Sequence, residues 1–155
     1  MADSKRQKIV DAVVARMQTI LTANSYSTNI GANVHDWRVN FQDDELPALS
    51  VCDLPATAAD DSQNGKLDRT IWLMPIQIRI YAVKDESPEN VREMVKDVQA
   101  AIRTDPQFKV SNIPLLMESW PETEGFIIPE ESFEVIGGSF QFVAMFITKK
   151  FNAEQ

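Results

Sequence analysis

The sequence has one cysteine, one histidine and only five glycines among its 155 residues. The single cysteine, Cys52, cannot form a disulfide within the chain, and the polar opening MADSKRQK contains no apolar signal core. We therefore expect synthesis in a reducing intracellular compartment. No apolar run is long enough to cross a bilayer. A chain of this length can bury about two thirds of its unfolded surface, so we expect residues 1–155 to fold as one domain.

Positive charge is also scarce. The chain carries 15 basic and 23 acidic residues, a formal net charge of -8 at pH 7. Because phosphate binding needs a clustered basic face, this balance argues against wrapping or sequence-specific binding of nucleic acid. An acidic surface instead favours solubility, and it suits a protein past which DNA slides without sticking.

Two segments have the apolar spacing of amphipathic helices. Residues 5–24 predict a helix that ends near Asn24, with its apolar stripe packed on a sheet. Residues 87–104 predict a second helix, with Ser87 as the N-cap, Pro88 at the first helical position and Asp105-Pro106 at its end. The stripe of the first helix consists of Ile9, Val10, Val13, Met17, Ile20 and Leu21, and that of the second consists of Val91, Met94, Val95, Val98 and Ile102.

Alternating apolar and polar residues predict two strands before the middle of the chain. Residues 34–41 form the first, with His35, Trp37, Val39 and Phe41 on its apolar face. Residues 46–54 follow after the acidic turn QDDE, and the short spacing predicts an antiparallel pair.

The remaining strands are longer. Residues 69–84 predict the longest strand, in which Pro75 should occupy a bulge or an edge because it cannot donate a ladder hydrogen bond. Residues 110–120 predict a strand interrupted by Pro114, and 121–132 a loop or short hairpin arm. Residues 132–150 close the sheet, with a bulge or turn at Gly137-Gly138 and apolar residues on both faces. The predicted fold class is α+β, a largely antiparallel mixed sheet with two helices packed on one face.

Residues 55–68, PATAADDSQNGKLD, are small, acidic and without a usable period. Such a composition buries too little apolar surface to offset the entropy of ordering. We expect a long loop that is mobile in the free subunit and becomes ordered when it contacts a partner.

The residue types that carry chemistry do not form a recognisable catalytic or metal-binding pattern. His35 and Asp36 are neighbours in a predicted strand, so their side chains should point to opposite faces and not act as a base with its orienting carboxylate. Cys52 fits a small buried side chain better than a nucleophile. The acidic clusters at 43–45 and 60–61 lack the spacing of a calcium loop. We expect no enzymatic activity, no cofactor and no bound metal.

The layout of the chain resembles the tail terminator proteins of long-tailed bacteriophages and prophages. The segments that carry the resemblance are the opening helix, YSTNIGANVHDWR, LPALSV, RTIWLMPIQIRIYAV, PENVREMVKDVQAAI and the long terminal strand. The resemblance implies a hexameric ring that caps the tail tube and provides the surface for head joining. It also implies that the partners are other copies of the chain, the tail tube protein and a head completion or connector protein, in the host cytoplasm during assembly and then in the virion tail.

Contact residues for such a ring are taken from the exposed loop and the two longest strands. Phe140 and Phe142 are included because the terminal strand has more apolar surface than two helices can cover. The complete set is Asp60, Asp61, Trp72, Gln77, Arg79, Phe140 and Phe142. Three alternatives stay open: another head–tail joining or tail completion subunit, a small cytoplasmic ligand-binding or enzyme domain, and a regulatory interaction module.

Overall fold

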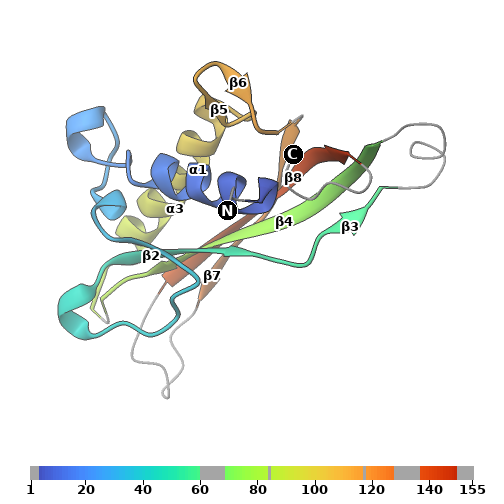
Figure 1. The fold of residues 1–155 in the computed structure, drawn as a ribbon. Helices are drawn as coiled ribbons and strands as arrows, with labels where there is room; N and C mark the ends of the chain where they lie inside the picture. Colours follow the sequence, from blue (N-terminus) through green and yellow to red (C-terminus); the bar gives the residue numbers. More distant parts are fainter. Residues whose placement is uncertain (1–3, 60–68, 84, 117, 128–136, 150–155) are drawn as a thin grey trace.

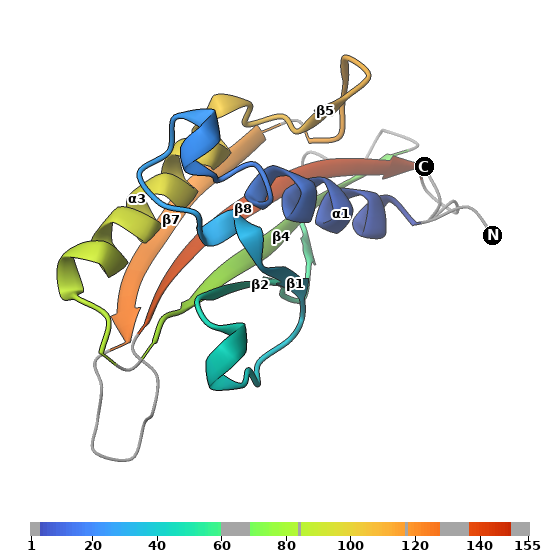
Figure 2. The ribbon, with the colours of Figure 1, turned by 90° about the vertical axis from the view of Figure 1, so that its left-hand side faces the viewer.

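The computed structural model describes residues 4–59, 69–83, 85–116, 118–127 and 137–149. Two helices lie on one face of a mostly antiparallel sheet, as Figures 1 and 2 show, so the predicted α+β class is confirmed. The strand order is β1-β2-β4-β8-β7, and β3 pairs beside β2 along β4. Within these residues, no helix is both long and apolar enough to cross a membrane.

Helix α1 spans Lys5–Met17 and begins where the Ser4 hydroxyl accepts a hydrogen bond from the backbone N–H of Gln7. It ends seven residues before the predicted Asn24. Gly31 explains the early end, because its N–H donates to the Ile20 carbonyl at 3.0 Å, and a Cβ on Gly31 would lie 2.4 Å from the Met17 carbonyl oxygen. Residues 30–32 (η2, Ile30–Ala32) therefore pass directly against the end of α1, and the short helix η1 (Thr22–Asn24) replaces the predicted last turn.

Helix α3 spans Pro88–Thr104 with Ser87 as its N-cap and Asp105 as its C-cap, as predicted. Pro88 begins the helix without the loss of a hydrogen bond, because the N–H of the first helical residue has no partner within the helix. The buried face of α3 contains the predicted stripe together with one charged residue, Asp97.

Strand β1 is short and parallel to its neighbour. It spans Val34–Asp36 and pairs in parallel with β2, Ala48–Asp53, so the predicted eight-residue antiparallel strand is wrong. Trp37 ends β1 because its φ of 54° lies in the left-handed region. The chain then crosses over through η3 (Asp43–Glu45), which leaves Trp37 and Val39 52% and 47% exposed instead of on an apolar face.

Strand β4, Arg69–Tyr81, lies at the centre of the sheet between β2 and β8, Gly137–Lys149. Its predicted face is confirmed, since alternate residues from Met74 to Ile80 are buried against the helices. Pro75 occupies neither a bulge nor an outer edge. It lies opposite the gap between β2 and β3 (Thr57–Ala58), where no ladder pair needs its N–H and its carbonyl accepts from the Leu54 N–H at 2.8 Å.

The chain after α3 differs most from its prediction. Residues 110–120 do not form one strand, because β5 (Lys109–Val110) and β6 (Ile113–Pro114) make a small separate hairpin. Strand β7, Glu118–Ile127, then pairs with β8. Of the two options predicted for 121–132, a loop or a hairpin arm, the described residues 121–127 form the hairpin arm. Gly137 and Gly138 are regularly paired, and the register shift lies instead in β7, between Pro121 and Thr123.

The long loop predicted at 55–68 begins with an ordered contact. Thr57 and Ala58 pair with Leu73 and Trp72 as strand β3. The rest of that loop, 60–68, lies outside the described residues.

Candidate functional site

A cleft of about 570 Å³ opens beside the N-terminus of α3. Its walls come from three parts of the chain: residues 28–33 around η2, residues 44–47 from η3 to the start of β2, and residues 86–94 at the start of α3. Ile30 and Met94 are buried, so the floor of the cleft is apolar. The lining consists of Thr28, Asn29, Ile30, Ala32, Asn33, Asp44, Glu45, Leu46, Pro47, Glu86, Asn90 and Met94.

The charged lining residues of the cleft are all acidic. Glu45 is neutralised, because both of its carboxylate oxygens accept from Arg38 at 2.6 Å. The backbone N–H of Gln42, followed by Arg38, lowers the pKa of Glu45 below its ordinary value. Among the described residues, Asp44 is exposed and has no basic partner, and Glu86 accepts from the backbone N–H of Ser87 alone. The cleft therefore suits a group that has an apolar body and a positive charge.

Asparagine side chains fix the shape of the cleft wall. The Asn33 amide donates to the Glu45 carbonyl, and its oxygen accepts from His35 Nε2 at 2.6 Å. The Asn29 oxygen accepts from both the N–H and the hydroxyl of Thr22. These bonds connect the two ends of η2 to η1, to η3 and to β1, so the wall of the cleft is preorganised.

His35 and Asp36 point away from each other. The ring of His35 lies 5.3 Å from that of Phe41, which in turn lies 5.0 Å from that of Tyr81. Asp36 lies instead near Asp53, and burial, then the charge of Asp53, raises its pKa above the ordinary value. The rings are tilted toward one another at 56° and 46°, so His35 belongs to an aromatic cluster with Phe41 and Tyr81.

Asp53 joins three elements at the edge of the sheet. It accepts from Arg6 Nε of α1 and, at 2.6 Å, from the indole N–H of Trp37. Burial alone would raise the pKa of Asp53, but the hydrogen bonds from Trp37 and Arg6 outweigh it and hold the pKa below the ordinary value. The left-handed conformation of Trp37 thus brings its indole to this carboxylate and leaves much of the ring exposed.

The face of the sheet opposite the helices is the second candidate surface, and we call it the open face. It carries three directly paired couples of half-buried apolar residues: Ile71 with Ile147, Leu73 with Met145, and Pro75 with Val143. The next pairs along the strands are polar, Gln77 with Gln141 and Arg79 with Ser139. The apolar patch of the open face therefore lies between Arg69, paired with Lys149 at one end of β4, and the polar pairs at Gln77 and Arg79.

The predicted contact residues divide among these surfaces. Gln77 and Arg79 lie on the open face, where Arg79 Nε donates to Gln77 Oε1 at 2.8 Å. Trp72 is half-buried on the helix side, and its indole N–H donates to the Thr148 hydroxyl at 2.9 Å.

Phe140 and Phe142 do not provide contact surface. They are 2% and 0% exposed and pack in the core, with Phe142 stacked 6.0 Å from Phe108. The prediction for these two residues was wrong because both faces of β8 are apolar, and the sequence does not show which set of alternate residues faces the helices. Asp60 and Asp61 lie outside the described residues.

Sequence reasoning missed the cleft and the β5–β6 hairpin. The cleft unites residues that are up to 66 positions apart between Thr28 and Met94, and no local pattern connects them. The hairpin has a local signal, because Ser111-Asn112 lies between two β-branched residues and Asn accepts the left-handed conformation that a two-residue turn needs.

Among the described residues, no group of three or more His, Cys, Asp or Glu side chains is placed to hold a metal ion. The chain matches no protein-family model and no curated protein.

Proposed function

We propose that this chain is a structural virion subunit, a tail terminator that forms a hexameric ring, caps the tail tube of a long-tailed phage or prophage and provides the head-joining surface. The proposal starts from the resemblance of its layout to that family. The α+β arrangement, with two helices on one face of the sheet, is compatible with that resemblance.

The observation that carries the proposal is the open face. Three adjacent couples of half-buried apolar residues form a continuous patch across β4 and β8, and the described helices lie on the other face of the sheet. Monomeric soluble proteins rarely leave a large continuous apolar patch uncovered. A subunit that packs laterally against copies of itself has a use for such a patch, because closed symmetric assembly buries it on every copy.

The charge of the chain supports the same role. A net charge of -8 would repel the phosphates of DNA that passes through the centre of a ring. The open face itself has basic residues, Arg69 and Arg79, at the two ends of β4. Contact through this face would thus bring basic groups toward an otherwise acidic neighbour.

The test combines native mass spectrometry of the purified chain with negative-stain images of the chain mixed with purified tail tubes. We expect rings, either free or at one end of the tubes. Leu73→Lys should abolish them, while Ala15→Glu, a charge added to the exposed side of α1, should leave them intact. Circular dichroism of both variants verifies that they fold. A chain that stays monomeric and ignores tube ends would overturn the proposal.

Another head–tail joining or tail completion subunit would use the same kind of apolar face. Binding to the purified connector rather than to the tube end would identify that role.

A second candidate comes from a different class and is favoured by the cleft. A cavity of about 570 Å³ with an apolar floor and convergent polar groups has the size of a small-molecule site. The chain would then be a small ligand-binding domain. A thermal-shift screen with cationic metabolites tests this, and stabilisation that Glu86→Gln removes would support it.

A further inference from the structure

We propose that the β5–β6 hairpin of one copy docks into the acidic cleft of the next copy, which makes the contact between neighbours head-to-tail. This inference rests on the proposed ring and adds the hairpin and the cleft to the open face at the contact between neighbouring subunits.

Two of the four exposed large apolar side chains among the described residues lie on the hairpin, and one of them, Ile113, is the most exposed of the four. Ile113 is 68% exposed and Val110 52%, and the two are paired with each other across the hairpin. The turn between them places Ser111 and Asn112 at φ values of 51° and 64°, the left-handed conformation at both central residues that a two-residue hairpin turn requires. In Figure 1 the hairpin stands clear of the helices and the sheet. An ordered turn that holds apolar residues in solvent is the expected form of a binding element.

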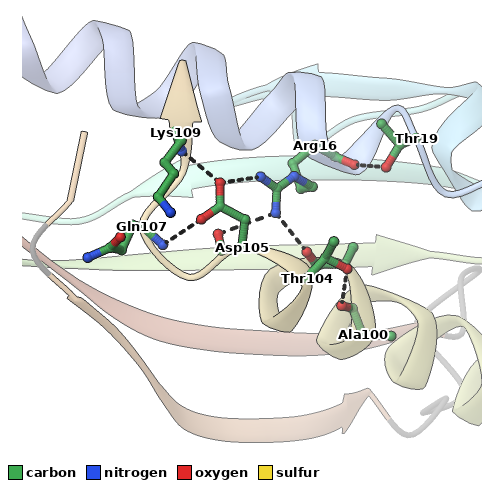
Figure 3. A network of polar contacts seen from close by, with 8 residues as sticks. Arg16, Thr19, Ala100, Thr104, Asp105, Gln107 and Lys109 are labelled. Atoms are coloured by element: carbon green, nitrogen blue, oxygen red, sulfur yellow. Dashed lines mark hydrogen bonds and ion pairs between the residues drawn. The ribbon is translucent and has the colours of Figure 1, made fainter. Parts of the chain in front are cut away.

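The base of the hairpin is firmly anchored, as Figure 3 shows. Asp105 accepts from the backbone N–H of Lys109 at 2.8 Å and from Arg16 at 3.3 Å, and Phe108 is buried beneath the guanidinium of Arg16 at 4.8 Å. Because burial is outweighed by the N–H groups of Lys109 and Gln107 and by Arg16, the pKa of Asp105 is lowered. The hairpin is thus preorganised, and docking would lose little conformational entropy.

The cleft complements the hairpin in charge and polarity. Lys109, exposed at the base of the hairpin, would meet Asp44 and Glu86, the two cleft carboxylates without a basic partner among the described residues. Val110 and Ile113 would cover the apolar floor formed by Ile30, Leu46 and Met94. The polar tip, Ser111-Asn112, would face the amides of Asn29 and Asn90.

The two surfaces lie at opposite ends of α3. The cleft is built around its first turns, at Asn90 and Met94, and the hairpin follows its last residue, Thr104. A helix of 17 residues is about 25 Å long, so the hairpin of a copy cannot reach its own cleft. Because the hairpin and the cleft lie on different parts of one subunit, the contact between them is heterologous. Heterologous contacts close into a ring when the rotation between subunits allows it.

The experiment mixes two defective copies. Ile113→Asp damages only the hairpin, and Glu86→Lys damages only the cleft. We expect each variant alone to lose ring formation in native mass spectrometry. A mixture should form one-to-one dimers that grow no further, because each pair has exactly one intact hairpin and one intact cleft.

A charge exchange provides the second measurement. Lys109→Glu should lose rings, and Lys109→Glu combined with Glu86→Lys in one chain should recover them at least tenfold over either single variant. Lys8→Glu, an exposed charge reversal on α1, is the control and should assemble normally.

The outcomes separate this inference from the proposed function. Rings that form normally from Ile113→Asp or Glu86→Lys would overturn the hairpin contact and leave the tail terminator role standing. A wild-type chain that forms no ring, even with tube ends, would overturn both. One-to-one dimers in the mixture, together with wild-type rings that do not bind tubes, would support the hairpin contact and overturn the tail terminator role.

Discussion

Asp97 on α3 binds Thr28 through two hydrogen bonds to one oxygen: Oδ2 accepts from the backbone N–H at 2.7 Å and from the hydroxyl at 2.8 Å. Both residues are buried, with Asp97 only 4% exposed. The other carboxylate oxygen accepts from the N–H of Ser27. A single side chain of α3 therefore fixes the segment that leads into η2 and the wall of the cleft.

Asp97→Ala should lower the free energy of unfolding by about 3 kcal/mol, because it leaves buried donors of Thr28 without an acceptor. Asp97→Asn keeps one acceptor oxygen and should cost less. Urea denaturation measures both values, and Asp85→Ala, an exposed carboxylate, is the control. Equal stability of Asp97→Ala and wild type would show that this contact does not hold the segment.

Gly31→Ala should destabilise the fold by about 1–3 kcal/mol, the range for overpacking. The new Cβ would lie 2.4 Å from the Met17 carbonyl oxygen and 2.8 Å from that of Ile20, and both are backbone atoms that cannot rotate away. Ala32→Ser, at the exposed neighbouring position, should change the melting temperature little. An unchanged melting temperature for Gly31→Ala would mean that α1 and η2 do not approach this closely.

The limits of sequence reasoning follow from the range of the forces involved. Helix α3 was predicted almost to the residue because its cap, its proline and its apolar stripe are all local. The predicted end of α1 was wrong because the helix is ended by a contact between Ile20 and Gly31, which lies eleven residues further along the chain. Ile20 is nevertheless buried as its spacing predicted.

Tertiary hydrogen bonds likewise explain the error at β1. The alternation from 34 to 41 predicted a strand, but the bond between the Trp37 indole and Asp53 forms only with the left-handed turn at Trp37. The sequence predicts which alternate residues of β4 face the helices. It does not do so for β8, because both faces of β8 carry apolar residues. Phe140 and Phe142 were assigned to a surface for that reason.

Arg16→Ala should loosen the hairpin more than the core. Arg16 donates to the Ala101 and Asp105 carbonyls at the end of α3 and covers the Phe108 ring. We expect a loss of about 1–2 kcal/mol in stability and faster hydrogen exchange at the Lys109 amide. Arg16→Lys should restore little, since an ammonium cannot reproduce the forked donors. Unchanged exchange at Lys109 in Arg16→Ala would contradict the anchoring role.

Asp53 and Asp36 should make the free energy of unfolding depend on pH in opposite directions. Hydrogen bonds from Trp37 and Arg6 stabilise ionised Asp53 and lower its pKa in the folded chain. The stability that ionised Asp53 contributes is therefore present above the ordinary pKa of 3.8, and it is lost as the pH falls through the folded pKa. Asp53→Asn should therefore lower stability at pH 7 by about 1–2 kcal/mol. At a pH below the folded pKa, the two proteins should be equally stable.

Asp36→Asn should act in the other direction. Burial and the charges of Asp53 and Asp11 raise the pKa of Asp36 above 3.8, so ionisation is harder in the folded chain than in the unfolded one. As the pH rises from 3.8 through the raised pKa, the folded state keeps its proton longer and the wild type loses stability. The variant carries no such group, so its advantage should be absent near pH 3, grow across that window and stay constant to pH 7. Because Asp36 is exposed and screened by solvent, we expect a gain below about 1 kcal/mol. Urea denaturation at pH 3, 5 and 7 measures it, and a variant less stable than wild type at pH 7 would show that Asp36 makes a favourable contact as an anion.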